Sequence, residues 1–234
     1  MPLDARPDHV AVAVHDLEAA AKRWGKELGG VWLSPRWSGG GFGTRQMRFS
    51  NLGKLELLEP DAPDGFAAGF LARFGPRIHH VTLKVPDLHA AVAEVEAAGY
   101  DLVDVSFARE EWHEAFMRPS QVGGLIVQIA RPLHDDAGWA SLAGIDLPPV
   151  DPDSPALLGP TLTAPDLEVS ARVWATLGAR IEELDEDTFE ARWGDAPLTV
   201  RVERGATAGP RGLRFDPDPG LPADDVAGPG TLPA

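Results

Sequence analysis

The sequence predicts an α+β protein built from repeated strand–helix–strand–strand–strand modules. A segment that starts with His, continues with a short β-rich run and ends in Asp-Leu occurs at His9–Leu17 and again at His80–Leu88. A polar residue follows each histidine at matched spacing, Glu56 after 47 positions and Gln128 after 48. We therefore expect two βαβββ modules that pair into a half-open curved barrel, followed by a third, degenerate βαβββ module.

Each of the first two copies is expected to contain one helix, because Asp-Leu opens an Ala/Glu-rich stretch that ends at glycine. Asp is typical of a helix N-cap and glycine of the position just after a helix. The runs that follow are rich in β-branched and aromatic residues, as strands are. The predicted helices are Glu18–Leu28 and His89–Ala98, and the later strands are Val31–Ser34, Arg45–Phe49, Lys54–Leu58, Leu102–Phe107, Glu114–Met117 and Leu125–Ala130.

A third copy of the pattern is present but less complete. Thr161–Leu167 repeats the strand-to-Asp-Leu pattern, and Glu168–Leu177 resembles a helix. Strand candidates follow at Thr188–Trp193, Leu198–Glu203 and Gly212–Phe215. The predicted domains are residues 1–132 with two modules and a metal site, a linker at 133–155, the third module at 156–216 and a Pro/Gly-rich tail at 217–234.

Composition excludes several classes of function. The chain has 234 residues, no cysteine and a net charge of −15, with 21 Lys and Arg against 36 Asp and Glu. Disulfides, cysteine-ligated metals and thiol nucleophiles are therefore excluded. An acidic chain without a basic cluster is unsuited to nucleic acid, and no apolar run approaches the length of a membrane span. The first residues carry charge and no apolar core, so we expect no signal peptide and a cytoplasmic location.

The repeat indicates a metal site. If the two copies pack as a pseudo-twofold pair, the equivalent residues His9, His80, Glu56 and Gln128 converge on one point. Two imidazoles, one carboxylate and one amide oxygen can hold one divalent ion, such as Co, Ni, Zn, Mn or Fe. Such an ion polarises a carbonyl or stabilises an enolate. The alternative is that both histidines are structural. In the third copy Gly159 stands at the histidine position, which indicates a structural role, covering a sheet edge or a contact in a homodimer.

Four segments of the first two copies resemble the vicinal oxygen chelate superfamily, which includes glyoxalase I, extradiol dioxygenases and bleomycin-resistance proteins. They are Asp8–Asp16, Asn51–Pro60, Ile78–Asp87 and Pro119–Ile129. The motifs NLGKLELLEP at Asn51–Pro60, GPRIHHVTLKVPDL at Gly75–Leu88 and GGLIVQI at Gly123–Ile129 are similar to those of methylmalonyl-CoA epimerases. The resemblance covers about residues 7–132. It implies a glyoxalase-like fold in which His9, Glu56, His80 and Gln128 hold the metal.

The sequence departs from the epimerases at both proton-transfer positions. The resemblance places one base at Gln128 and the other on the strand that contains Gln46, and an amide has no useful basicity. His113 and Glu114, on the corresponding strand of the second copy, are the alternative catalytic residues, unless Glu110–Glu114 is a solvated strand edge. Glu59 and His79 are expected to face away from the site, and the loop Ser38–Gly43 is expected to be a flexible flap.

Three functions remain open. The first is a divalent-metal enzyme, an isomerase or lyase of the glyoxalase/epimerase type, acting on a small carbonyl or thioester substrate through a metal-stabilised enolate or oxyanion. The second is a metal-free protein of the drug-resistance type that binds or sequesters a small molecule. The third is a non-haem iron dioxygenase that uses His9, His80 and Glu56.

Overall fold

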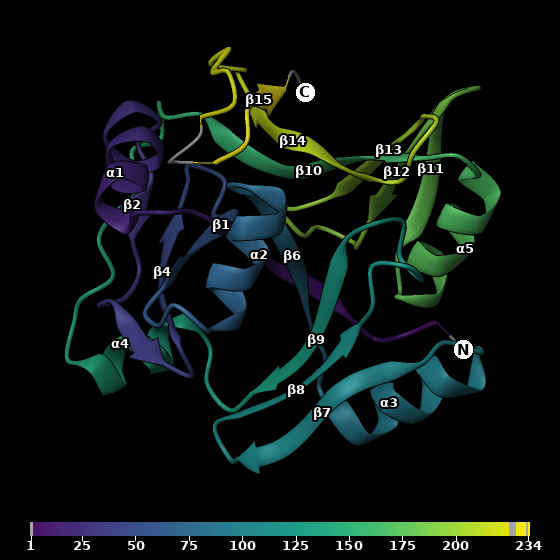
Figure 1. Ribbon diagram of the computed structural model, residues 1–234, viewed down its shortest axis with the longest axis horizontal. Helices are drawn as coiled ribbons and strands as arrows, with labels where there is room; N and C mark the ends of the chain where they lie inside the picture. Colours follow the sequence, from purple (N-terminus) through teal and green to yellow (C-terminus); the bar gives the residue numbers. More distant parts are fainter. Residues whose placement is uncertain (1, 225–227, 233) are drawn as a thin grey trace. The chain divides into compact units, whose positions relative to one another are not determined.

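The computed structural model describes residues 2–224, 228–232 and 234 (Figure 1). The order of the elements contains three times a strand, a helix and then at least three further strands, starting at β1, β6 and β10. The elements are β1 Arg6–Ala13, α1 Leu17–Ala21, the π-helix η1 Lys22–Glu27, β2 Val31–Trp32, β3 Trp37–Gly39, β4 Phe42–Arg48, β5 Lys54–Pro60, α2 Phe66–Phe74, β6 Arg77–Lys84, α3 Leu88–Ala97, β7 Leu102–Arg109, β8 Trp112–Met117, β9 Ile126–Pro132, α4 Asp136–Ala143, β10 Ala156–Ala164, α5 Leu167–Thr176, β11 Arg180–Asp185, β12 Thr188–Arg192, β13 Val200–Arg204, β14 Gly209–Asp216 and β15 Thr231–Leu232.

The strands form two mixed sheets, which confirms the α+β class. The first sheet has nine strands in the order β2-β4-β5-β1-β6-β9-β8-β7, with β3 paired to β4. The second has six strands in the order β11-β12-β13-β10-β14-β15. Each order is an open path that does not return to its first strand. The described strands therefore close no barrel, and the predicted half-open curved barrel is not seen; two open sheets stand in its place.

Two compact units interleave along the chain. One unit contains the residues up to Asp8, together with His80–Leu133 and Gly159–Arg211. The other contains His9–His79, His134–Leu158 and the chain from Gly212 onward. The predicted division at residues 132, 155 and 216 stays a prediction. Among the described residues, none of the helices is both long enough and apolar enough to cross a membrane.

The frame predicted from the repeat is present in each of the first two copies. In both, the first strand pairs in parallel with the last, β1 with β5 and β6 with β9. The registers are equivalent, since Ala11 lies opposite Glu56 and Thr82 lies opposite Gln128. Asp87 caps α3 by accepting hydrogen bonds from the His89 and Ala90 amides, as an N-cap carboxylate does. The predicted correspondence of the two copies is confirmed at the level of register.

The third copy repeats the same frame. β10 and β13 are parallel, with Thr161 opposite Arg201, and Asp166 caps α5 through the Val169 amide. α5 packs against β11, β12 and β13. Trp174 on this helix is fully buried and meets the Trp193 ring edge-on, with ring centroids 6.0 Å apart. The third copy also contains β11, a strand that the sequence analysis did not identify.

Several elements differ from the sequence expectations. The first helix is regular only over Leu17–Ala21 and continues as a π-helix. α2 was not predicted, and its N-cap residue Gly65 supplies no side-chain hydrogen bond, so the usual start signal is missing. The predicted linker contains α4. The C-terminal segment returns to the sheet, because Thr231 lies opposite Leu213 in the parallel β14–β15 pair.

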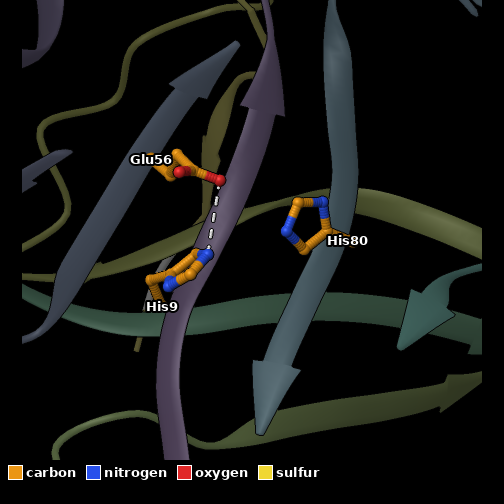
Figure 2. Close-up of side chains that lie close together, drawn as sticks. All are labelled: His9, Glu56 and His80. Carbon is orange, nitrogen blue, oxygen red and sulfur yellow. Dashed lines mark ion pairs between the residues drawn. The ribbon is translucent and has the colours of Figure 1, made fainter. Parts of the chain in front are cut away.

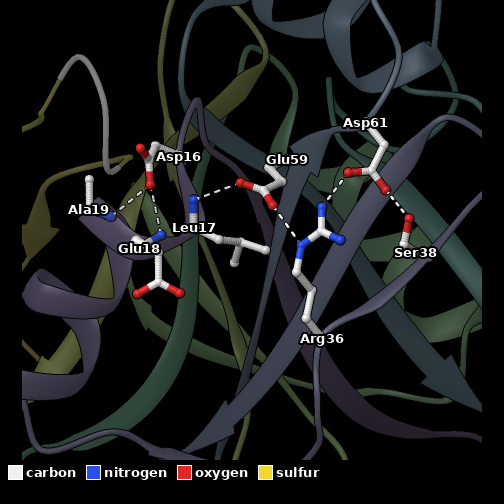
Figure 3. A network of polar contacts seen from close by, with 8 residues as sticks. All are labelled: Asp16, Leu17, Glu18, Ala19, Arg36, Ser38, Glu59 and Asp61. Atoms are coloured by element: carbon white, nitrogen blue, oxygen red, sulfur yellow. Dashed lines mark hydrogen bonds and ion pairs between the residues drawn. The ribbon is translucent and has the colours of Figure 1, made fainter.

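A polar network fixes the junction of β5, α1 and the β3–β4 hairpin (Figure 3). Glu59 accepts a hydrogen bond from the Leu17 amide at 2.9 Å and another from Arg36 Nε at 2.7 Å. Arg36 and Ser38 also donate to Asp61. Glu59, which was expected to face away from the site, thus holds these three segments together. The segment Ser38–Gly43, predicted as a flap, forms the end of this hairpin.

Candidate metal centre

The first copy places His9, Gln46 and Glu56 on one face of the sheet. Glu56 lies opposite Ala11 on β1 and opposite Gln46 on β4. Because side chains alternate between faces along a strand, His9 shares the face of Ala11. His9 Nε2 and Glu56 Oε2 are 3.3 Å apart. The Gln46 amide nitrogen lies 3.4 Å from His9 Nδ1 and donates to Glu56 Oε1 at 3.4 Å. Gln46 therefore orients the imidazole and the carboxylate together.

His80 on β6 completes a group of three donors (Figure 2). One ligand atom each from His9, Glu56 and His80 lies within 4.8 Å of the others. Over the described ranges it is the one such group of three or more His, Cys, Asp or Glu side chains. His9 and His80 are buried, with 2% and 6% of their surface exposed, so the cluster is shielded from water.

The donor set fits a divalent ion. Two atoms that each lie about 2.1 Å from one ion are at most about 4.2 Å apart, so a pair at the outer limit of 4.8 Å reaches a shared ion after a side-chain adjustment of about 0.6 Å. The His9–Glu56 pair at 3.3 Å already satisfies this limit. Two imidazole nitrogens and one carboxylate suit Zn, Co, Ni or Fe. The structure thus brings together three of the four ligands predicted from the sequence.

The fourth predicted ligand, Gln128, makes two other contacts. Its amide oxygen accepts a hydrogen bond from Thr82 Oγ1 at 2.6 Å, and its amide nitrogen donates to Glu114 Oε2 at 2.7 Å. Gln128 shares its face with Thr82 through the register of β6 and β9, and His80 is two residues before Thr82. Gln128 therefore lies on the face of β6 that carries His80, held between a hydroxyl and a carboxylate.

The two predicted catalytic residues lie on opposite faces of β8. Glu114 shares the face of Gln128, since the two side chains are hydrogen-bonded, and it also accepts from Trp112 Nε1 at 3.0 Å. His113 is the next residue and so points the other way. Its ring meets Phe107 edge-on at 5.2 Å. Of the two, only Glu114 lies on the face that carries His80.

His79 points away from the cluster, as the alternation along β6 predicts. Its ring packs against Phe70 and Phe66, with ring centroids 4.6 and 5.5 Å apart. Burial among these rings lowers the pKa of His79 to about 4, against the opposing attraction of the Glu56 carboxylate. A neutral imidazole between two phenyl rings is a packing residue.

One charged residue on the site face was missed in the sequence analysis. Lys54 lies opposite His9 in the β1–β5 register, and its side chain is 6% exposed. In the second copy the equivalent residue is Ile126, opposite His80. A lysine in one copy where the other has an isoleucine is a sequence signal that could have identified this position.

The fold and this donor set define a class of protein. A model of the Glyoxalase/Bleomycin resistance protein/Dioxygenase superfamily matches residues 8–116, and the chain belongs to this superfamily, as its motifs predicted.

Among its relatives are methylmalonyl-CoA epimerases. The human (Homo sapiens) mitochondrial methylmalonyl-CoA epimerase is 32% identical over 129 residues, which cover 53% of this chain and 72% of that protein. The ethylmalonyl-CoA/methylmalonyl-CoA epimerase of Cereibacter sphaeroides is 32% identical over 130 residues, 53% of this chain and 96% of that protein.

A solved structure supports the fold over nearly the whole chain. A hypothetical protein from Staphylococcus aureus has a TM-score of 0.68 at 10% identity and covers 98% of this chain and 100% of its own. The glyoxalase-like fold therefore extends beyond the segment that the epimerases match.

Proposed function

We propose that this chain is a divalent-metal-dependent enzyme of the glyoxalase/epimerase type that acts on a small carbonyl or thioester substrate. The observation that carries the proposal is the buried group of His9, Glu56 and His80, whose ligand atoms lie within 4.8 Å of one another. The similarity to epimerases that act on acyl-CoA thioesters favours a thioester. A divalent ion, when bound, supplies Lewis-acid polarisation of the substrate carbonyl.

The roles of the protein residues follow from their contacts. His9, Glu56 and His80 hold the ion, and Gln46 keeps His9 and Glu56 in a ligating orientation by its amide contacts at 3.4 Å. Burial of the two histidines excludes water from the ion and strengthens its pull on a carbonyl oxygen. Gln128 lies on the same face as His80 and positions the Glu114 carboxylate.

Proton transfer is assigned to Glu114. Gln46 and Gln128 are amides and cannot accept a proton at the carbon next to a carbonyl. The Glu114 carboxylate is oriented by N–H donors from Trp112 and Gln128, so one of its oxygens is held in a defined direction. In this proposal Glu114 takes the proton from the substrate carbon and returns it.

Two measurements test the proposal. The first is metal analysis of chelator-free protein beside the His9→Ala, His80→Ala double variant; we expect about one equivalent of metal, lost in the double variant. The second is deuterium incorporation at the α-carbon of methylmalonyl-CoA in D₂O, which Glu114→Gln should slow by about 100-fold. A metal-free native chain that also fails to take up added Co(II) would exclude this function.

The same donor set favours a second candidate. Two histidines and one carboxylate form the ligand pattern of non-haem iron oxygenases. Oxygen consumption that requires Fe(II) and is not supported by Co(II) or Zn(II) would favour this candidate over the enolate chemistry.

A third candidate rests on the amides. Gln46 and Gln128 stand where a two-base enzyme needs proton acceptors, which suits a metal-free binding protein of the drug-resistance type. Absence of bound metal together with tight binding of a small apolar ligand would favour it.

A further inference from the structure

The site face of the first copy carries two cations that the metal centre does not use. Lys54 lies opposite His9 on β5, and Arg48 lies opposite Lys54 on β4. Both side chains therefore share the face of His9 and Glu56. The chain as a whole has a net charge of −15, so these cations are the groups on this face that attract an anion, whether that anion belongs to the chain or to a ligand.

A single segment of the chain contacts both cations. Lys54 Nζ lies 2.7 Å from Asp136 Oδ1, in the first turn of α4. Arg48 Nη2 donates to the Pro148 carbonyl oxygen at 2.7 Å. Asn51 fixes the end of the same segment, because its amide donates to the Leu157 carbonyl and its oxygen accepts from the Leu157 amide. Residues 134–158, which include most of the linker predicted at 133–155, therefore lie along the site-bearing strands of their own unit.

The Lys54–Asp136 pair is asymmetric in burial. The Lys54 side chain is 6% exposed, whereas the Asp136 side chain is 37% exposed. A buried ammonium must keep an anionic partner, since an unpaired charge in a protein interior is strongly unfavourable. A half-exposed carboxylate can rotate into water at little expense. The ammonium is thus fixed, and its carboxylate partner is exchangeable.

We propose that Lys54 binds an anionic group of the ligand, a carboxylate, and that Asp136 is an internal competitor for the same contact. The inference deepens the proposed function, because it gives the ligand a carboxylate beside the carbonyl that the metal would polarise. Asp136 lies outside residues 8–116, the part matched by the superfamily model.

The competition predicts opposite effects for two substitutions. Lys54→Met removes the cation while keeping the length of the side chain, so carboxylate affinity falls. Asp136→Asn removes the competing anion and keeps the shape, so carboxylate affinity rises. Lys26→Met is the matched control, because it removes one lysine charge from an exposed position on η1.

The experiment is calorimetric binding of malonate, with malonamide as the neutral probe, to the full chain with and without Co(II). We expect malonate to bind at least about tenfold more weakly to Lys54→Met and about threefold more tightly to Asp136→Asn, with Lys26→Met unchanged. Malonamide should not distinguish the variants. Circular dichroism and urea midpoints check that each variant is folded.

The outcomes separate this inference from the proposed function. Equal malonate affinity in the native chain and Lys54→Met, or no malonate binding by the native chain, overturns the inference. Failure to bind Co(II) with the malonate pattern intact overturns the metal centre and keeps the carboxylate contact. Weaker malonate binding to Asp136→Asn shows that Asp136 supports the ammonium rather than competes for it, which also overturns the inference.

Discussion

The first and third copies share one backbone frame and differ in what it carries. In the first copy Glu56 lies between Ala11 and Gln46, and in the third Arg201 lies at the same register between Thr161 and Glu190. A candidate metal ligand is thus replaced by a guanidinium, and an amide by a carboxylate.

The backbone explains why the third copy has no histidine at the position of His9. Gly159, seven residues before the Asp166 cap just as His9 precedes Asp16, has a φ of 118°. A Cβ at this position would lie 2.1 Å from the carbonyl oxygen of Thr199. The residue just before β13 thus approaches β10 too closely for any side chain at position 159. The helix caps and the parallel strand pairs therefore form without the site. The site also needs room for a side chain at the position of His9, and it needs the ligand residues themselves.

The largest expected effect is loss of metal from the first copy. His9→Ala should weaken Co(II) binding by more than about 100-fold, because even the partners that orient ligands contribute about 10- to 100-fold. Isothermal titration and Co(II) absorption measure the affinity. His15→Ala is the control, an exposed histidine near the end of the same strand. If both variants bound Co(II) equally well, His9 would not be a ligand.

The next effect concerns the ion pairs of the third copy. Glu190 is 2% exposed and pairs with Arg192 and Arg201, the latter at 3.6 Å. Glu190→Gln leaves both guanidinium groups without this carboxylate and should lower the free energy of unfolding by about 2 kcal/mol. This is less than the roughly 3–5 kcal/mol of fully buried pairs, because Arg192 is 42% exposed and Arg201 19%. Urea unfolding measures the change.

Metal binding provides the contrast for this variant. Co(II) affinity should stay native in Glu190→Gln, because the ligands lie in other copies. A loss of Co(II) binding without a loss of stability would contradict the separation of the two copies.

The reciprocal exchange in the first copy has a smaller effect that depends on metal. Gln46→Glu adds a second carboxylate beside Glu56, so repulsion should lower the stability of the metal-free chain by about 1 kcal/mol. With Co(II) present the added charge should raise metal affinity by about tenfold. Urea unfolding with and without Co(II) measures the change in stability and the change in metal affinity. If Gln46→Glu changed the stability with the same sign in both conditions, residue 46 would lie away from the ion.

The helix caps and the strand faces were predictable from residues close together in the sequence, whereas contacts between distant residues were not. Asp87 and Asp166 cap their helices as expected because N-capping depends on neighbouring residues alone. The grouping of His9, Glu56 and His80 was predictable because alternation and the repeat both place residues on faces.

The missed features depend on partners far along the chain. Lys54 pairs with Asp136, which is 82 positions further along the chain. The spacing of residues in the sequence does not predict such a pair. The α+β class and the strand pairing were predicted, but the curvature of the half-open barrel was not found in the two open sheets, because curvature depends on contacts between strands far apart in the sequence. α4 was read as linker because its eight residues include a glycine and give only a short periodic signal.

The smallest expected effect compares the hairpins of the two copies. In the first, Asp61 accepts from Arg36 and Ser38, and these bonds lower the pKa of the Asp61 carboxyl, the Ser38 bond most. The lowered pKa means that the contribution to stability is complete above the ordinary value of 3.8 and is lost as pH falls through the lower folded value. In the third copy Asp187 accepts from Arg204 at 2.5 Å, and both side chains are at least half exposed.

Asp61→Asn should therefore open the β3–β4 hairpin locally, since water screens a solvent-exposed pair and leaves little effect on the global unfolding midpoint. The measurement is hydrogen exchange at the Asp61 and Ala62 amides, which donate to the Gly41 carbonyl. Their protection should fall severalfold in Asp61→Asn and lose its dependence on pH below about 4. Asp187→Asn should change exchange at the Arg204 amide less, because Asp187 accepts from the Arg204 side chain and, within the described part of the chain, has no second side-chain donor such as Ser38 provides for Asp61. Equal changes in the two hairpins would mean that the arginine alone holds each turn, and that Ser38 adds nothing to the first.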